Sequence, residues 1–93
     1  MQIAIDVPDY DNGMHMLWEP YADIAVFVVD ETVRIHANRP GLVSLARLFL
    51  TLADARVPEH NHWHLDPPPV GNLVPGSASA IFQVEDSPDP TYW

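Results

Sequence analysis

The chain has no cysteine among its 93 residues. That absence excludes a disulfide framework, a zinc site built on thiolates and a cysteine nucleophile. Long apolar runs are absent too: no segment approaches the roughly 20 residues of a membrane span, so we expect no membrane contact. The acidic N-terminus lacks the basic-then-apolar layout of a signal peptide, and together these absences predict a cytoplasmic protein.

Positive charge is scarce. The chain contains 4 arginines and no lysine, against 13 aspartates and glutamates. The formal net charge is therefore −9 at pH 7. Such a surface repels nucleic acid, whose binding requires cations that neutralise phosphates. It attracts a basic protein partner, although many acidic surfaces serve solubility alone.

The length of 93 residues predicts a single domain, residues 1–93. Residues 1–21 form an acidic, irregular segment, in which the alternation of Ile3 and Ile5 favours a short edge strand. Residues 22–86 form the core, and residues 87–93 form a proline-rich tail that we expect to be irregular.

The clearest short-range pattern predicts a β-hairpin. "IAVFVV" and "TVRIHA" are β-branched runs separated by Asp30 and Glu31, which is the spacing of a tight turn. In the second run Val33 and Ile35 point to one side and Arg34 points to the other. One face of the hairpin is therefore expected to be buried and the other wetter.

A helix is predicted next, with its N-cap at Asn38, a proline in its first turn and Arg56 near its C-terminal end. Its apolar face is expected to contain Leu42, Leu45, Phe49, Leu52 and Ala53. Its opposite, polar face is expected to contain Ser44, Arg47, Thr51 and Asp54. A stripe of this kind indicates a helix that lies across a sheet.

Two further strands, "HNHWHLD" and "ASAIFQVED", flank a loop that contains four prolines. The order of elements is a hairpin, a helix and two more strands. It predicts an α+β fold, with a single helix packed on one face of a mainly antiparallel four- to five-stranded sheet.

The first of these strands carries histidine at every second position. Because side chains alternate along a strand, His62, His64 and Asp66 are expected on one face. Trp63 and Leu65 are expected on the other face, in the core beneath the helix. The histidines then lie on the half-exposed side of the sheet, where they meet water or a partner.

A metal site at His62, His64 and Asp66 is the alternative. Two imidazoles spaced roughly 6.5–7 Å apart on a strand can converge on one ion, with the carboxylate as a third ligand. Metal-dependent hydrolases that use this pattern need further ligands from distant segments, for which His15 and His36 are the candidates.

A set of short motifs follows in order from residue 37 to residue 84. They are Ala37-Asn38, Gly41-Leu42, Ser44 to Ala46, Leu52-Ala53, Val57-Pro58, His62, His64 to Asp66, Leu73, Gly76-Ser77 and Ile81 to Val84. No single motif is diagnostic, but the ordered set resembles the immunity protein 32 family of bacterial polymorphic-toxin systems. The resemblance extends over roughly residues 33–85.

The resemblance implies a protein without enzymatic activity or cofactor, which binds a cognate toxin and blocks it. An acidic chain suits a basic toxin such as a nuclease domain. The residues we expect to contact the partner are Asp6, Asp9, Asp11, His62, His64 and Asp66. Two alternatives stay open: a small metal-binding protein or metal-dependent hydrolase, and a structural module that forms a homodimer through an open sheet face.

Overall fold

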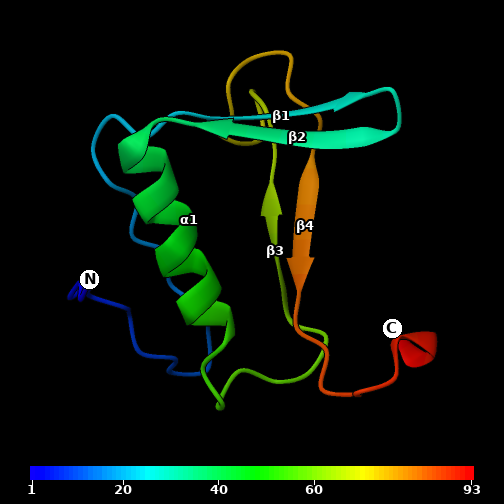
Figure 1. The fold of residues 1–93 in the computed structure, drawn as a ribbon. Coiled ribbons are helices and arrows are strands. Elements are labelled where there is room, and N and C mark those ends of the chain that lie inside the picture. The colour runs from blue at the N-terminus through cyan, green and yellow to red at the C-terminus, as the bar shows by residue number, and fades with distance from the viewer.

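The chain folds into two β-hairpins and one helix in this computed structural model, which describes all residues from 1 to 93 (Figure 1). The elements are β1 (Ile24–Val29), β2 (Thr32–Ala37), α1 (Arg39–Leu52), β3 (His62–Leu65), β4 (Ala80–Gln83) and the 3-10 turn η1 (Pro90–Tyr92). The hairpin of β1 and β2 lies across the ends of β3 and β4, and α1 runs down beside them. The tail predicted to be irregular thus contains one short turn.

The β1–β2 hairpin is confirmed with the predicted bounds. Its six residue pairs align one to one, without a bulge. Asp30 and Glu31 close the turn with φ angles of 50° and 63°, both in the left-handed region. Two successive left-handed residues match the right-handed twist of the flanking strands, so this acidic pair makes the turn that asparagine and glycine usually make.

Asn38 begins α1 as predicted. Its side-chain oxygen accepts hydrogen bonds from the N–H of Gly41 at 2.8 Å and from the N–H of Asp23 at 3.0 Å. The helix start is thereby tied to the residue before β1. Glycine is required at position 41, because a Cβ there would lie 2.5 Å from the Asp23 carbonyl oxygen. No helix has the length and apolarity needed to cross a membrane.

The structure confirms the α+β class but corrects the predicted sheet. β1 pairs with β2 and β3 pairs with β4, both antiparallel, so two small sheets replace the single sheet of four to five strands.

The free edge of β1 is occupied by residues 74–78, which keeps β3 and β4 from joining the first sheet. The N–H of Val74 donates to the carbonyl of Ile24 at 2.8 Å. The N–H of Ala78 donates to the carbonyl of Val26 at 2.7 Å. This segment contains a proline, which has no N–H to donate, so it covers the edge without forming a regular strand.

The core lies between α1, the inner half of the first hairpin and β3. Its buried residues are Ile24, Val26, Leu45, Leu48, Leu52, Leu65 and Leu73. Leu45, Leu48 and Leu52 follow one another at helical steps and supply the contribution of α1. Phe49 and Phe82 meet edge to face with ring centroids 5.0 Å apart, which joins α1 to β4.

The N-terminal segment forms no strand, so the predicted edge strand is wrong; the segment instead lies against α1. Arg47, whose exposed fraction is 9%, holds it there. The guanidinium donates from Nε to the Asp6 carbonyl at 2.8 Å and from Nη1 to the Leu17 carbonyl at 3.0 Å. It donates from Nη2 to the Glu19 carboxylate at 3.1 Å.

The predicted faces of α1 are corrected by the same contacts. Three residues of the expected polar face are buried, namely Ser44, Arg47 and Thr51. Four large apolar residues are exposed, namely Leu42, Val43, Phe49 and Leu50. Burying polar groups costs free energy unless they are hydrogen bonded. The N-terminal segment supplies partners to Arg47 and to Ser44, whose Oγ accepts from the N–H of Glu19 at 2.9 Å. Thr51 Oγ1 instead donates to the Arg47 carbonyl within α1 at 2.8 Å.

Replacing Arg47 with methionine tests how the N-terminal segment is held. We expect the free energy of unfolding to fall by about 2 kcal/mol, because two carbonyls and one carboxylate lose their donor. Residues 1–19 should also be cut faster by a protease. Urea unfolding and limited proteolysis measure the two effects.

Arg56→Met is the matched control, because Arg56 also contacts the segment, through Asp9, but its side chain is 58% exposed. Exposed ion pairs contribute little to stability, so the loss should be smaller. An equal loss in both variants would show that Arg47 has no special role.

Candidate functional site

The outer face of the β3–β4 sheet, which we define as His62, His64, Ile81 and Gln83, points away from the core. The alternation predicted for β3 is found: Leu65 is buried and Trp63 packs against the core. The rings of His62 and His64 lie edge to face with centroids 4.9 Å apart. The outer face thus offers two neighbouring imidazoles and one exposed aliphatic side chain.

The structure does not bring the side-chain donor atoms of His62, His64 and Asp66 within 4.8 Å of one another. Asp66 follows the end of β3, and its backbone carbonyl accepts a hydrogen bond from Leu73 at 3.1 Å. The donor atoms that the structure does bring within 4.8 Å of one another belong to Glu59, His60 and Glu85.

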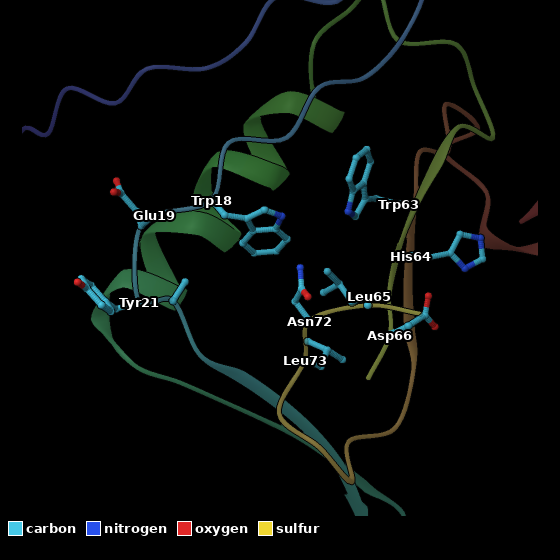
Figure 2. Close-up of a pocket in the computed structure, with 11 residues that line it drawn as sticks. Trp18, Glu19, Tyr21, Trp63, His64, Leu65, Asp66, Asn72 and Leu73 are labelled. Carbon is cyan, nitrogen blue, oxygen red and sulfur yellow. The ribbon is translucent and has the colours of Figure 1, made fainter. Parts of the chain in front are cut away.

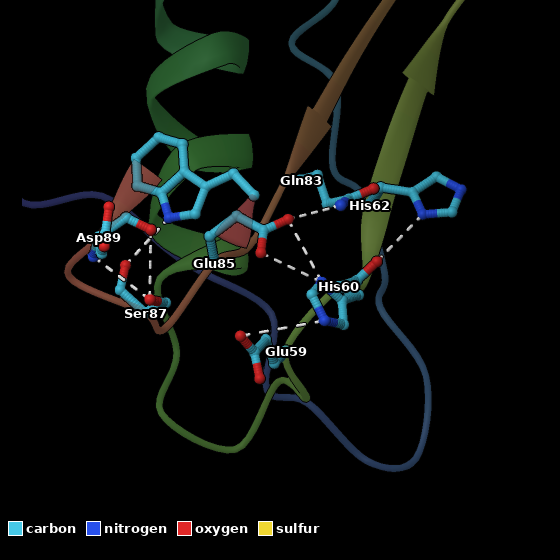
Figure 3. Close-up of polar contacts among 8 residues, drawn as sticks. Glu59, His60, His62, Gln83, Glu85, Ser87 and Asp89 are labelled. Atoms are coloured by element: carbon cyan, nitrogen blue, oxygen red, sulfur yellow. Dashed lines mark hydrogen bonds and ion pairs between the residues drawn. The ribbon is translucent and has the colours of Figure 1, made fainter. Parts of the chain in front are cut away.

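The cluster of Glu59, His60 and Glu85 lies where the β3–β4 ladder continues beyond the strands (Figure 3). His60 Nδ1 is 3.1 Å from Glu85 Oε2, and His60 Nε2 is 3.9 Å from Glu59 Oε1. The carboxylates therefore flank opposite edges of one imidazole. His60 Nδ1 also lies 3.3 Å from Glu85 Oε1, and one ligand atom from each of the three residues lies within 4.8 Å of the others, so the cluster combines a hydrogen bond with a candidate set of metal ligands.

The electrostatics of the cluster centre on Glu85, whose side chain is 9% exposed. The side-chain amide of Gln83 donates to this carboxylate and is the main reason that the pKa of Glu85 lies below its usual value of 4.5. The hydrogen bond and positive charge of His60 lower the pKa further, whereas burial raises it. The backbone beyond the strands explains the pair: the N–H of His60 donates to the carbonyl of Val84 at 2.8 Å, which brings His60 beside Glu85.

The three N-terminal aspartates expected to contact a partner are all exposed. Two of them already have partners within the chain: Asp11 lies 2.7 Å from His15 Nε2, and Asp9 accepts from Arg56 Nη2 at 3.2 Å. The hydrogen bonds of Arg56 also hold the pKa of Asp54 at about 2. Arg56 thus contacts the N-terminal segment through an exposed ion pair, whereas its bonds to Asp54 stay within the residues after α1.

A cleft of about 440 Å³ opens between the N-terminal segment and β3. Figure 2 shows the rings of Trp18 and Trp63 on its sides and the amide of Asn72 beneath them, while His64 points away on the far side of β3. Indoles and an amide offer stacking faces and N–H donors. Trp18 and Asn72 could not be predicted as neighbours, because both come from irregular segments without a periodic pattern.

The family model described as immunity protein 32 matches residues 32–87, which is more than half of the chain. The chain belongs to the immunity protein 32 family. No curated protein and no solved structure matches it.

The part that matches the immunity protein 32 family begins at the first residue of β2 and contains α1, β3 and β4. The outer face and the cluster at Glu85 therefore lie within the family region. The three N-terminal aspartates and β1 precede it. The chain thus joins a family core to an N-terminal segment that the family model does not describe.

Glu85→Gln tests the electrostatics of the cluster. A carboxylate whose pKa is lower in the folded state stabilises the fold above its unfolded pKa, and this contribution is lost as the pH falls below 4.5. We therefore expect the stability of Glu85→Gln to decline less than that of the wild type between about pH 6 and about pH 3. Urea unfolding across this range measures the difference.

Gln83→Leu is the companion variant, because it removes the main donor and keeps the carboxylate. Its stability should decline with a slope between those of the wild type and Glu85→Gln. Identical slopes in all three proteins would rule out a stabilising carboxylate at this site.

Proposed function

We propose that this chain protects a bacterial cell by binding a cognate toxin stoichiometrically, and that it catalyses no reaction itself. The observation that carries the proposal is the match of residues 32–87 to the immunity protein 32 family. An immunity protein of this kind acts in the cytoplasm as part of a polymorphic toxin system, and it blocks its toxin by covering a functional surface.

The charge of the chain supports a basic toxin, such as a nuclease domain that must itself bind phosphates. A net charge of −9 attracts such a protein over a distance and speeds their encounter. Asp6, Asp9 and Asp11 are exposed on a segment that Arg47 fixes in place. A fixed set of charges can orient the partner as well as attract it.

The outer face is the second part of the proposed contact surface. His62 and His64 stand beside each other on it, and both side chains are exposed to a partner, although His62 Nδ1 already lies 3.2 Å from the His60 carbonyl oxygen. Asp66 follows at the end of the same strand and adds a carboxylate. Imidazole at neutral pH both donates and accepts hydrogen bonds, so this face can meet polar groups of either kind.

Co-expression tests the function directly. We expect a toxin gene immediately upstream of the gene for this chain. Cells that produce that toxin should grow when they also produce this chain, and the two proteins should purify together in equal amounts. Growth arrest in the presence of the folded chain, with no complex formed, would refute the proposal.

Neutralising Asp6, Asp9 and Asp11 together as asparagines tests the role of the acidic segment. We expect association with a basic toxin to slow by about tenfold at low salt, with little change in dissociation, because charges at the rim of an interface act mainly on encounter. Raising the salt concentration should shrink the difference. Surface plasmon resonance at two ionic strengths measures both rates.

The matched control changes net charge equally at other sites, through Glu59→Gln, Asp86→Asn and Asp89→Asn. Its association rate should fall less than that of the N-terminal variant. Equal rates in the two triple variants would mean that overall charge alone attracts the toxin.

A further inference from the structure

The outer half of the β1–β2 hairpin carries aliphatic side chains that the rest of the chain leaves exposed. Val28 and Val33 form a cross-strand pair, and their exposed fractions are 62% and 63%. Ile35 stands next to them on the same face and is exposed as well. The inner half of this face is buried, since it supplies Ile24 and Val26 to the core. Figure 1 shows the outer half projecting beyond β4.

The backbone of the hairpin has two edges, and the pattern of hydrogen bonds shows which residues face each edge. Alternate residues of an antiparallel strand direct both backbone groups towards one neighbour. In β1, Val26 uses its N–H and its carbonyl outside the hairpin, towards Ser77 Oγ and Ala78. Its cross-strand partner Ile35, and Val33 two residues before it, therefore direct their backbone groups outwards from β2.

The outward edge of β2 is free, whereas residues 74–78 cover the inner half of the edge of β1. Edge strands are commonly protected by a charged side chain, a proline, a bulge or short length. Of these devices β2 has only the charge of Arg34: it contains six residues, pairs one to one with β1 and has no proline. β3 and β4 are shorter, with four residues each, and Pro67 follows soon after β3.

Charge favours a different protein over a second copy of this chain as the occupant of that edge. Two copies would bring two net charges of −9 together, and the turn at Asp30 and Glu31 would add acid at the contact. Pairing by edges alone would also leave the valines of both copies exposed, because they lie on the face of the sheet. A positively charged partner gains from the charge and can cover both the edge and the face.

We propose that the free edge of β2 accepts an extended strand from a positively charged partner protein. This inference rests on the proposed function, under which the partner is the toxin. Main-chain hydrogen bonds to Val33 and Ile35 supply affinity, and apolar side chains at alternate positions of the added strand cover the exposed valines. The N-terminal aspartates attract the toxin, and the hairpin holds it.

Two proline variants test the edge. Val33 and Val28 face each other, are equally exposed and direct their N–H groups outwards on opposite edges. Proline at either position removes one outward donor and one exposed valine but no hydrogen bond between β1 and β2. The probe is the toxin encoded immediately upstream of this gene, made catalytically inactive, and the measurement is its dissociation constant by calorimetry.

We expect Val33→Pro to weaken binding by about tenfold or more and Val28→Pro to weaken it by less than about threefold. Equal weakening, or none, would overturn the docking edge, provided that thermal unfolding shows both variants folded. If the wild-type chain fails to bind the toxin, both the proposed function and the docking role of the β2 edge are refuted. If the wild type binds and Val33→Pro binds equally well, only the docking edge is refuted.

Amide hydrogen exchange of the wild-type chain gives a second test that needs no variant. In the free chain the amides of Val33 and Ile35 should exchange fast, and that of Arg34 should exchange slowly because it bonds to β1. Addition of the inactive toxin should slow Val33 and Ile35 selectively. Unchanged exchange at both residues in the complex would contradict strand addition.

Sedimentation of the wild type and of Val33→Pro without toxin addresses the second-copy alternative. We expect monomers in both samples at micromolar concentration. A wild-type dimer that Val33→Pro abolishes would assign the edge to a second copy and overturn the proposal.

Discussion

The buried guanidinium of Arg47 is the contact on which the arrangement of this chain depends. A charged group at this depth must be paired or hydrogen bonded, and the irregular N-terminal segment meets that requirement with two carbonyls and the carboxylate of Glu19. The segment therefore lies along the polar side of α1. Other sides of the helix are not covered, and Leu42, Phe49 and further apolar residues of α1 remain exposed at the surface.

The first hairpin serves two purposes along its length. Its inner half closes the core over α1 and β3, and residues 74–78 cover the β1 edge there. Its outer half leaves the body of the molecule and gains no stability from burial. The packed inner half fixes the direction in which the exposed outer half projects.

Features that depend on residues close together in the sequence could be predicted, whereas contacts between residues far apart in the sequence could not. Both strands of the first hairpin, the Asn38 cap and the alternation along β3 depend on neighbours within a few residues, and all three were predicted. The faces of α1 were predicted only in part: Leu45 and Leu52 are buried as expected, but Arg47 is buried too, because it finds a partner 41 residues away at Asp6. The pairing of His60 with Glu85 likewise needs the backbone contact between two distant segments. Such contacts depend on the tertiary structure and leave no periodic pattern in the sequence.

The acidity of the chain can protect the exposed valines and the open edge of β2 from aggregation. Free edges with aliphatic side chains are templates for uncontrolled stacking of like molecules. Here the net charge of −9 opposes that stacking at neutral pH through mutual repulsion. The exposed valines and the free edge are thus protected from self-association by the acidic residues of the whole chain, which include Asp30 and Glu31 at the turn of the same hairpin. Near the isoelectric point of about 4.5 that protection disappears, and the hairpin becomes the place where aggregation would begin.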